Sequence, residues 1–136
     1  MKNSSIIVLF LVAILSFSFA EANRTLPSDD NVNCGAAILS GCVGTCGGSY
    51  SDGTEAPVSG LYCFDAVSSL CPTNGAKTVL RKNGTVIFSG DTSGGISFFF
   101  PASAGDKIEV KAELFNKKTN VVCVWLGNVN ITVSQP

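Results

Sequence analysis

The sequence predicts an all-β protein, a small antiparallel β-sandwich whose N-terminal half is rich in loops and stapled by disulfides. Short apolar runs separated by turn residues about every 8 to 12 positions fill the C-terminal half, as is typical of sandwiches. Five of the six cysteines lie between positions 34 and 71, in a glycine-rich segment without clear periodicity. The even number of cysteines favours complete pairing in an oxidising compartment.

The N-terminus has the pattern of a secretory signal peptide. Lys2 precedes an apolar run over residues 6–15, and the small residues at positions 20 and 22 fit a cleavage site. The run is shorter than the roughly 20 residues needed to cross a bilayer, so we expect no stable membrane anchor. We expect the mature protein to be secreted and extracellular. The predicted organisation is a signal peptide over 1–22, a flexible tail over 23–33 and a single disulfide-stabilised β domain over 34–136.

The cysteines are expected to form three disulfides. They are Cys34, Cys42, Cys46, Cys63, Cys71 and Cys123. If all six pair, Cys123 must bond to one of the other five, and that bond holds the first half against the sandwich. By the chain-entropy argument such a bond contributes roughly 3 to 5 kcal/mol.

The composition argues against catalysis and against metal binding. Histidine is absent from the chain, which removes Ser–His and Cys–His nucleophile pairs and the commonest zinc ligand. The acidic residues show neither EF-hand spacing nor an evident facing pair. We therefore predict no catalytic residues, no metal site, no cofactor and no enzyme activity.

An asparagine–glycine pair predicts a tight hairpin in the C-terminal half. Asn83 and Gly84 separate two β-rich runs, and this residue pair accepts the positive φ angles of a type I′ turn. A two-residue turn at this place pairs Leu80 with Ile87 and Val79 with Phe88.

Strict alternation predicts a strand over residues 107–115. Its apolar residues alternate with charged ones, so one face packs on a core and the other meets water. The inward side chains are Ile108, Val110, Ala112 and Leu114. Further strands are predicted over 96–100 and over the last segment, where Val129, Ile131 and Val133 point inward. Residues 121–126 are apolar on both faces, as expected of a central strand, and one short helix is predicted over 64–70.

Three sequons predict N-linked glycans on a secreted chain, at Asn23, Asn83 and Asn130. Asn83 is expected at the exposed hairpin tip. Asn130 is expected to face outward, because its neighbours Val129 and Ile131 face inward. Both positions are therefore surface positions in the predicted fold.

Charge and aromatic content define the expected partners. The formal net charge is −1, so the chain lacks the basic surface that nucleic acid requires. We predict a secreted, non-catalytic, effector-like binding or interaction protein, whose partner is an unknown extracellular protein or an apolar small molecule. Phe98, Phe99 and Phe100 are consecutive, so one strand sends rings to both faces. They either fill the core or help to form an apolar ligand cavity, for which the candidate residues are Phe98, Phe100, Val110 and Trp125.

Two segments resemble the ML lipid-recognition domains: CFDAVSSLCPTNG over 63–75 and FPASAGDKIEVKAELFNKKTNVVC over 100–123. Members of that family are secreted, disulfide-bonded β-sandwiches that hold a lipid or sterol between their two sheets. The resemblance implies a lipid or sterol carrier as the alternative function. It also implies the pairings Cys34–Cys123, Cys63–Cys71 and Cys42–Cys46.

Overall fold

A computed structural model describes residues 34–136. The predicted signal peptide, the predicted tail and Asn23 lie outside the described residues. The described chain forms eight strands: β1 (Ala37–Gly44), β2 (Ser49–Glu55), β3 (Gly60–Ser68), β4 (Asn74–Lys82), β5 (Thr85–Asp91), β6 (Ile96–Ala102), β7 (Lys107–Asn116) and β8 (Asn128–Ser134). No helix long and apolar enough to cross a bilayer occurs between residues 34 and 136.

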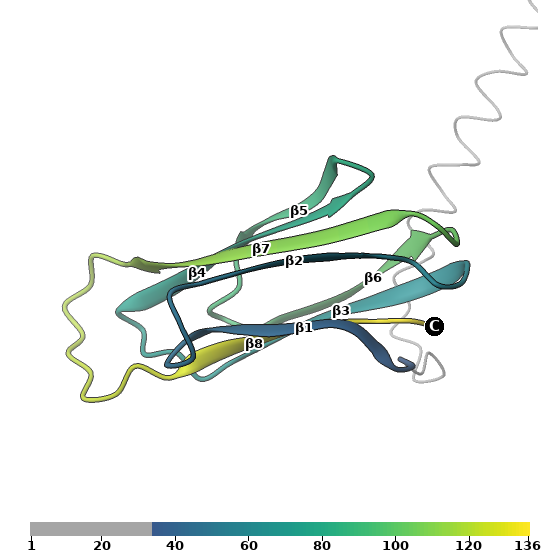
Figure 1. Ribbon diagram of the computed structural model, residues 1–136. Helices are drawn as coiled ribbons and strands as arrows, with labels where there is room; N and C mark the ends of the chain where they lie inside the picture. Colours follow the sequence, from purple (N-terminus) through teal and green to yellow (C-terminus); the bar gives the residue numbers. More distant parts are fainter. Residues whose placement is uncertain (1–33) are drawn as a thin grey trace, which may run out of the picture. The chain divides into compact units, whose positions relative to one another are not determined.

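The strands form two antiparallel four-stranded sheets that lie as two layers (Figure 1). The strand order is β1-β8-β3-β6 in the first sheet and β2-β7-β4-β5 in the second. Only β4 and β5 are consecutive strands that pair within one sheet, so every other connection in the described chain crosses between the layers. The predicted all-β sandwich is therefore confirmed.

The core lies between the two sheets and is built from alternate residues of each strand. In β7, Ile108, Val110 and Ala112 are buried, and in β8 the buried residues are Val129, Ile131 and Val133. Their neighbours along each strand turn away from the core, which confirms the predicted alternation in both strands. The largest buried side chains are Tyr62, Phe64 and Leu80.

The first half of the described chain is more regular than the sequence suggested. Three complete strands lie within residues 34–76, so the expectation of a loop-rich half is wrong there. The strand β2 is polar on both faces and lies at the edge of the second sheet, where only Tyr50 and Thr54 are partly covered. The predicted helix over 64–70 is also wrong: most of it belongs to β3, where Phe64 and Ala66 alternate into the core.

The predicted hairpin is confirmed, with a different register. Asn83 (φ 52°) and Gly84 (φ 81°) form the turn between β4 and β5. Leu80 pairs with Phe88 rather than with Ile87, because a bulge adds one residue to β5. The shift places the ring of Phe88 against the core.

The predicted central strand over 121–126 is wrong. These residues belong to loop 117–127, which connects β7 to β8. The central positions of the two sheets are taken by β8 and β3 in one and by β7 and β4 in the other. An apolar segment that was expected to be buried is therefore placed at the surface.

The disulfides are Cys34–Cys63, Cys42–Cys46 and Cys71–Cys123. The structure confirms that Cys123 bonds to one of the five earlier cysteines, and it has the expected Cys42–Cys46 bond. The pairings Cys34–Cys123 and Cys63–Cys71 implied by the family resemblance are wrong. Cys71 and Cys123 lie in two connections at the same end of the sandwich, which brings these two residues together.

Candidate binding end of the sandwich

Four connections gather at one end of the sandwich, which we call the loop end. They are residues 45–48, 69–73, 92–95 and 117–127. The strand registers place them together, since Gly44 pairs with Asn128 and Asn74 pairs with Asn116. Loop 117–127 is the longest of the four and projects beyond the ends of the strands (Figure 1).

The projecting loop exposes a run of apolar side chains over residues 121–125, which we call the apolar tip. Val122 is 91% exposed, Val124 98% and Trp125 57%, and Val121 is also exposed. Four of the nine large hydrophobic residues exposed in the described chain thus fall within five consecutive positions. Single exposed hydrophobic residues are ordinary, whereas a cluster of them makes the tip a candidate interaction surface.

The apolar tip is held in place by the connection between β3 and β4. The disulfide Cys71–Cys123 lies at its centre. The Cys71 amide donates a hydrogen bond to the Leu126 carbonyl (2.9 Å), and the Trp125 indole N–H donates to the Ser69 carbonyl (3.4 Å). The tip is therefore exposed and at the same time anchored to the connection between β3 and β4.

The ends of loop 117–127 are fixed as well. The Lys117 amide donates to the Thr73 carbonyl (2.8 Å), and the Ser69 amide donates to the Asn128 carbonyl (2.7 Å). Gly127 has a φ of +73°, and a Cβ at this position would overlap the Ser69 carbonyl. A glycine is therefore required where the loop enters β8.

A polar pocket lies at the loop end, with a volume of about 430 Å³. It is lined by Leu70, Pro72, Asn74, Asp91, Ser93, Gly94 and Lys117. Carboxylate, amide, hydroxyl and ammonium groups therefore meet in one small depression, each able to hydrogen-bond a polar group of a ligand.

Asp91 organises this pocket. Its carboxylate accepts hydrogen bonds from the amides of Ala76 and Ser93 (both 3.0 Å) and forms an ion pair with Lys117 (2.6 Å). Partial burial acts to raise the pKa of Asp91, but the hydrogen bonds from Lys117, Ser93 and Ala76 outweigh it and lower the pKa to about 2. Through its ion pair with Lys117, Asp91 therefore links the β5–β6 connection to the residue that follows β7.

The same cluster is not arranged for catalysis. The Ser93 hydroxyl donates to Asp91 (2.9 Å) and accepts a hydrogen bond from the Lys117 ammonium (2.8 Å). An ammonium that donates to a hydroxyl and pairs with a carboxylate is not placed to take the proton of that hydroxyl. Within residues 34–136 no group of three or more potential metal ligands comes together.

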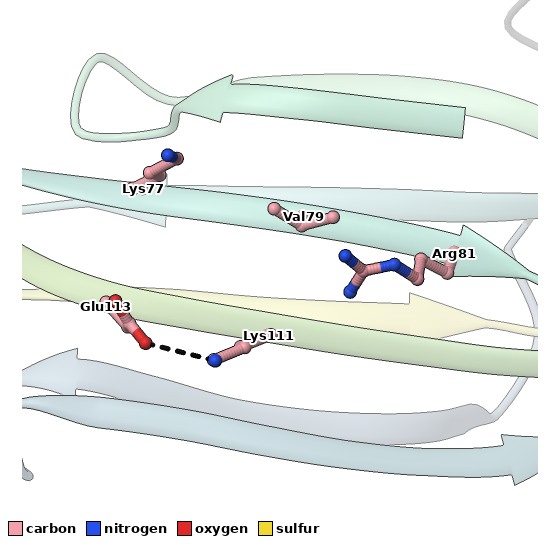
Figure 2. A pocket seen from close by; sticks show the side chains of 5 residues that line it. All are labelled: Lys77, Val79, Arg81, Lys111 and Glu113. Atoms are coloured by element: carbon pink, nitrogen blue, oxygen red, sulfur yellow. Dashed lines mark ion pairs between the residues drawn. The ribbon is translucent and has the colours of Figure 1, made fainter. Parts of the chain in front are cut away.

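A second, smaller hollow of about 200 Å³ lies on the outer face of the second sheet (Figure 2). It is lined by Lys77, Val79 and Arg81 of β4 and by Lys111 and Glu113 of β7. Lys111 and Glu113 form an ion pair (3.3 Å), and Lys77 lies directly across from Glu113. Three of the five lining residues are basic and one is acidic, and both Lys77 and Lys111 have Glu113 as a neighbour, as is typical of a solvated sheet face.

The residues predicted to contact an apolar ligand do not all meet. Phe98 packs against Phe64 with ring centroids 4.9 Å apart, and Phe100 and Val110 belong to the buried core. Trp125 lies in the apolar tip at the loop end. Neither the polar pocket nor the outer-face hollow is lined by any of these four residues.

The sequence pattern predicts neither the apolar tip nor the polar pocket as a site. It indicates Trp125 only as part of an apolar ligand cavity. The available signal was the order of residues around it: a polar run with two lysines, then a cysteine flanked by valines, then a glycine. This order suits a projecting loop fixed by a disulfide as well as it suits a buried strand.

The two sequons within the described residues are at the surface. Asn130 is exposed on the outer face of the first sheet, where it pairs with Cys42 and Val67. Asn83 is exposed at the hairpin tip, and its side chain bonds to Asp106 and to the Lys107 amide. Whether either residue carries a glycan stays a prediction.

Comparisons with known proteins assign neither a family nor a ligand. No protein-family model matches the chain, and no curated protein matches it. Among solved structures it is similar to a family 35 carbohydrate-binding module from Clostridium thermocellum, with 16% identity, a TM-score of 0.39, and coverage of 65% of this chain and 70% of that one. It is also similar to dimeric latent PorU from Porphyromonas gingivalis, with 13% identity, a TM-score of 0.24 and coverage of 75% of this chain. That alignment covers only 11% of the PorU chain.

Proposed function

We propose that the protein is a secreted, non-catalytic extracellular binding protein that contacts its partner through the loop end. The observation that carries this proposal is the apolar tip, which is exposed to water and fixed by a disulfide at the same time. The side chains of Val122 and Val124 are almost fully exposed and contribute little to the stability of the free protein. Their burial against a partner would contribute to affinity.

Three lines support an extracellular location. The three disulfides fit an oxidising compartment. Both sequons within the described residues lie at exposed positions, where a glycan can be carried. The sequence pattern of residues 1–22 is that of a secretory signal peptide.

Binding at the loop end is better supported than binding between the sheets. The rings of Phe88 and Phe98 lie 5.4 Å apart and those of Phe64 and Phe88 lie 5.8 Å apart, so they fill the region between the layers. Trp125, the remaining candidate contact, is at the loop end. A lipid carrier of the kind implied by the family resemblance would need space where these rings now pack.

The experiment compares adhesion of the full secreted chain and of two double variants to intact cells of the producing organism. Val122→Ser with Val124→Ser removes apolar surface from the tip. The matched control is Val58→Ser with Val86→Ser, since these valines are also exposed but lie outside the loop end. Thermal unfolding of each variant checks that folding is unchanged.

We expect the tip variant to lose most of its adhesion while the control variant binds like the unchanged protein. Equal adhesion of all three proteins would show that the tip is not the binding surface. Turnover of a substrate by the purified protein would contradict the non-catalytic part of the proposal.

A further inference from the structure

We propose that the partner of the apolar tip is the surface of a lipid bilayer, into which Val122, Val124 and Trp125 insert. This inference rests on the proposed function, because it takes the loop end as the binding surface. It adds the chemical class of the partner, a lipid bilayer, and states that the side chains of the tip insert into it.

The first argument is the shape of the apolar surface. Val122 and Val124 are 91% and 98% exposed, so they touch almost nothing of their own domain. Side chains that project in this way are buried only by a medium that closes around them. The acyl boundary of a bilayer does so without a preformed pocket, and each valine that becomes fully buried raises the partition coefficient by roughly tenfold or more.

The second argument is the placement of Trp125. Its ring is 57% exposed, while its N–H is turned back to the Ser69 carbonyl. Tryptophan has an apolar body and a polar N–H, and it is enriched at the level of the lipid headgroups. With its N–H already bonded inside the protein, the exposed part of the ring can enter the interface without leaving a donor unpaired.

The third argument is the distribution of charge. The chain has no Asp or Glu after Glu113, and the four connections of the loop end carry only Lys117 and Lys118 as charged residues. Asp91, the carboxylate that lines the polar pocket at this end, is paired with Lys117. Bringing this end to a bilayer therefore desolvates no unpaired carboxylate, and Lys118 is available to anionic headgroups.

The opposite end of the sandwich lacks this combination. Its connections include Asp106, whose neighbours at the strand ends are Glu55, Lys82 and Lys107. Val58 is the large hydrophobic residue exposed in those connections, and Val86 and Ile87 are partly exposed near the start of β5, each less than Val122 and Val124. The two ends therefore differ in both apolar surface and charge, and only the loop end is suited to a bilayer.

The test uses vesicles and the fluorescence of the full secreted chain. Trp125 is the single tryptophan of the protein, so the emission reports on the tip alone. We expect phosphatidylcholine vesicles containing phosphatidylserine to co-sediment with the protein and to move the emission to shorter wavelength. Brominated phosphatidylcholine should quench the emission, which requires contact between the indole and the acyl region.

Three variants test which residues are responsible for vesicle binding. Val122→Ser with Val124→Ser should lower the partition coefficient at least about tenfold, since both valines lose apolar surface. Val58→Ser with Val86→Ser should leave it unchanged. Lys118→Glu should weaken binding to vesicles that contain phosphatidylserine and leave binding to pure phosphatidylcholine little changed.

The outcomes separate this inference from the proposed function. Absence of co-sedimentation and of quenching by brominated lipid, together with tip-dependent adhesion to cells, would overturn the bilayer and leave a protein partner at the same tip. Vesicle binding that is equal in the tip variant and the control would overturn insertion of the tip. Loss of tip dependence in both assays would overturn the inference and the proposed function together.

Discussion

Cys71 and Cys123 are joined by a disulfide that bridges 52 positions of the sequence, with their Cα atoms 6.0 Å apart. Cys71 is fully buried beside β4, whereas Cys123 sits between two exposed valines. The bond therefore ties the apolar tip to the core of the sandwich.

Removing this bond should destabilise the protein strongly. For Cys71→Ala with Cys123→Ala we expect the free energy of unfolding to fall by about 4 kcal/mol, because the bond restricts a long loop of the unfolded chain. Guanidinium chloride unfolding of the variant and of the unchanged protein gives this difference. The control is Cys42→Ala with Cys46→Ala, whose bond spans only 4 positions and should contribute less. An equal loss in both variants would contradict the account.

Tyr50 should be replaceable by phenylalanine with a gain in stability. Its hydroxyl is buried, and among residues 34–136 it has no hydrogen-bond partner. Burial, with a further contribution from Asp52, raises the pKa of this hydroxyl. Removing an unsatisfied polar group should raise the free energy of unfolding by about 1 kcal/mol.

The control for this prediction is Tyr62→Phe. The Tyr62 hydroxyl donates to the Val58 carbonyl at 2.6 Å, so its removal should destabilise the fold by about 1 kcal/mol. Thermal unfolding of the two variants should therefore move in opposite directions. A loss of stability in Tyr50→Phe would mean that its hydroxyl has a partner.

Asp91 should stabilise the fold in a pH-dependent way. Its pKa is about 2 in the folded protein and 3.8 without the fold, so acid favours the unfolded state across that interval. Its contribution is fully present above pH 3.8 and is lost as the pH falls through about 2. We expect Asp91→Asn to cost about 1 kcal/mol at neutral pH.

The measurement is the free energy of unfolding of both proteins as a function of pH. The gap between the unchanged protein and Asp91→Asn should close as the pH falls below 4, by the same linkage. Asp52→Asn serves as the control, because the hydrogen bond found for that carboxylate within the described chain comes from the adjacent Gly53 amide. A gap that stays constant down to the lowest pH would show that Asp91 does not act through its charge.

Asn130 should carry an N-linked glycan in the secreted protein. It is exposed on β8, and the third residue of its sequon, Thr132, is on the same face of the sheet. Asn130→Gln should lower the intact mass by one glycan, and enzymatic deglycosylation should remove the difference. A secreted protein with the bare peptide mass at this site would contradict the prediction.

The parts of the fold that depend on local pattern were predictable from the sequence. The alternation in β7 assigns Ile108 and Val110 to the core, and Asn83-Gly84 specifies the hairpin turn. Strand β2 was missed because a polar edge strand has no alternation to detect, and its place depends on pairing with β7 far along the chain. The bulge that shifts Phe88 is likewise absent from the residue pattern.

The candidate site was only partly predictable, for a physical reason that concerns residues 121–126. A segment that is apolar on both faces is equally consistent with a buried central strand and with a loop that projects into a partner. The sequence contains no local signal that separates the two. The choice is made by the Cys71–Cys123 bond and by the contacts of Ser69 with Trp125 and Asn128, all of which join distant parts of the chain.

The central claim is that residues 121–125 form the binding surface, and the most direct measurement is the accessibility of Trp125 in the free and bound protein. Acrylamide quenching reports on this residue alone, because it is the only tryptophan. The account predicts strong quenching in the free protein, where Trp125 is 57% exposed, and markedly weaker quenching when the protein is bound to vesicles or to its extracellular surface. Equal quenching in the free and bound states would contradict it.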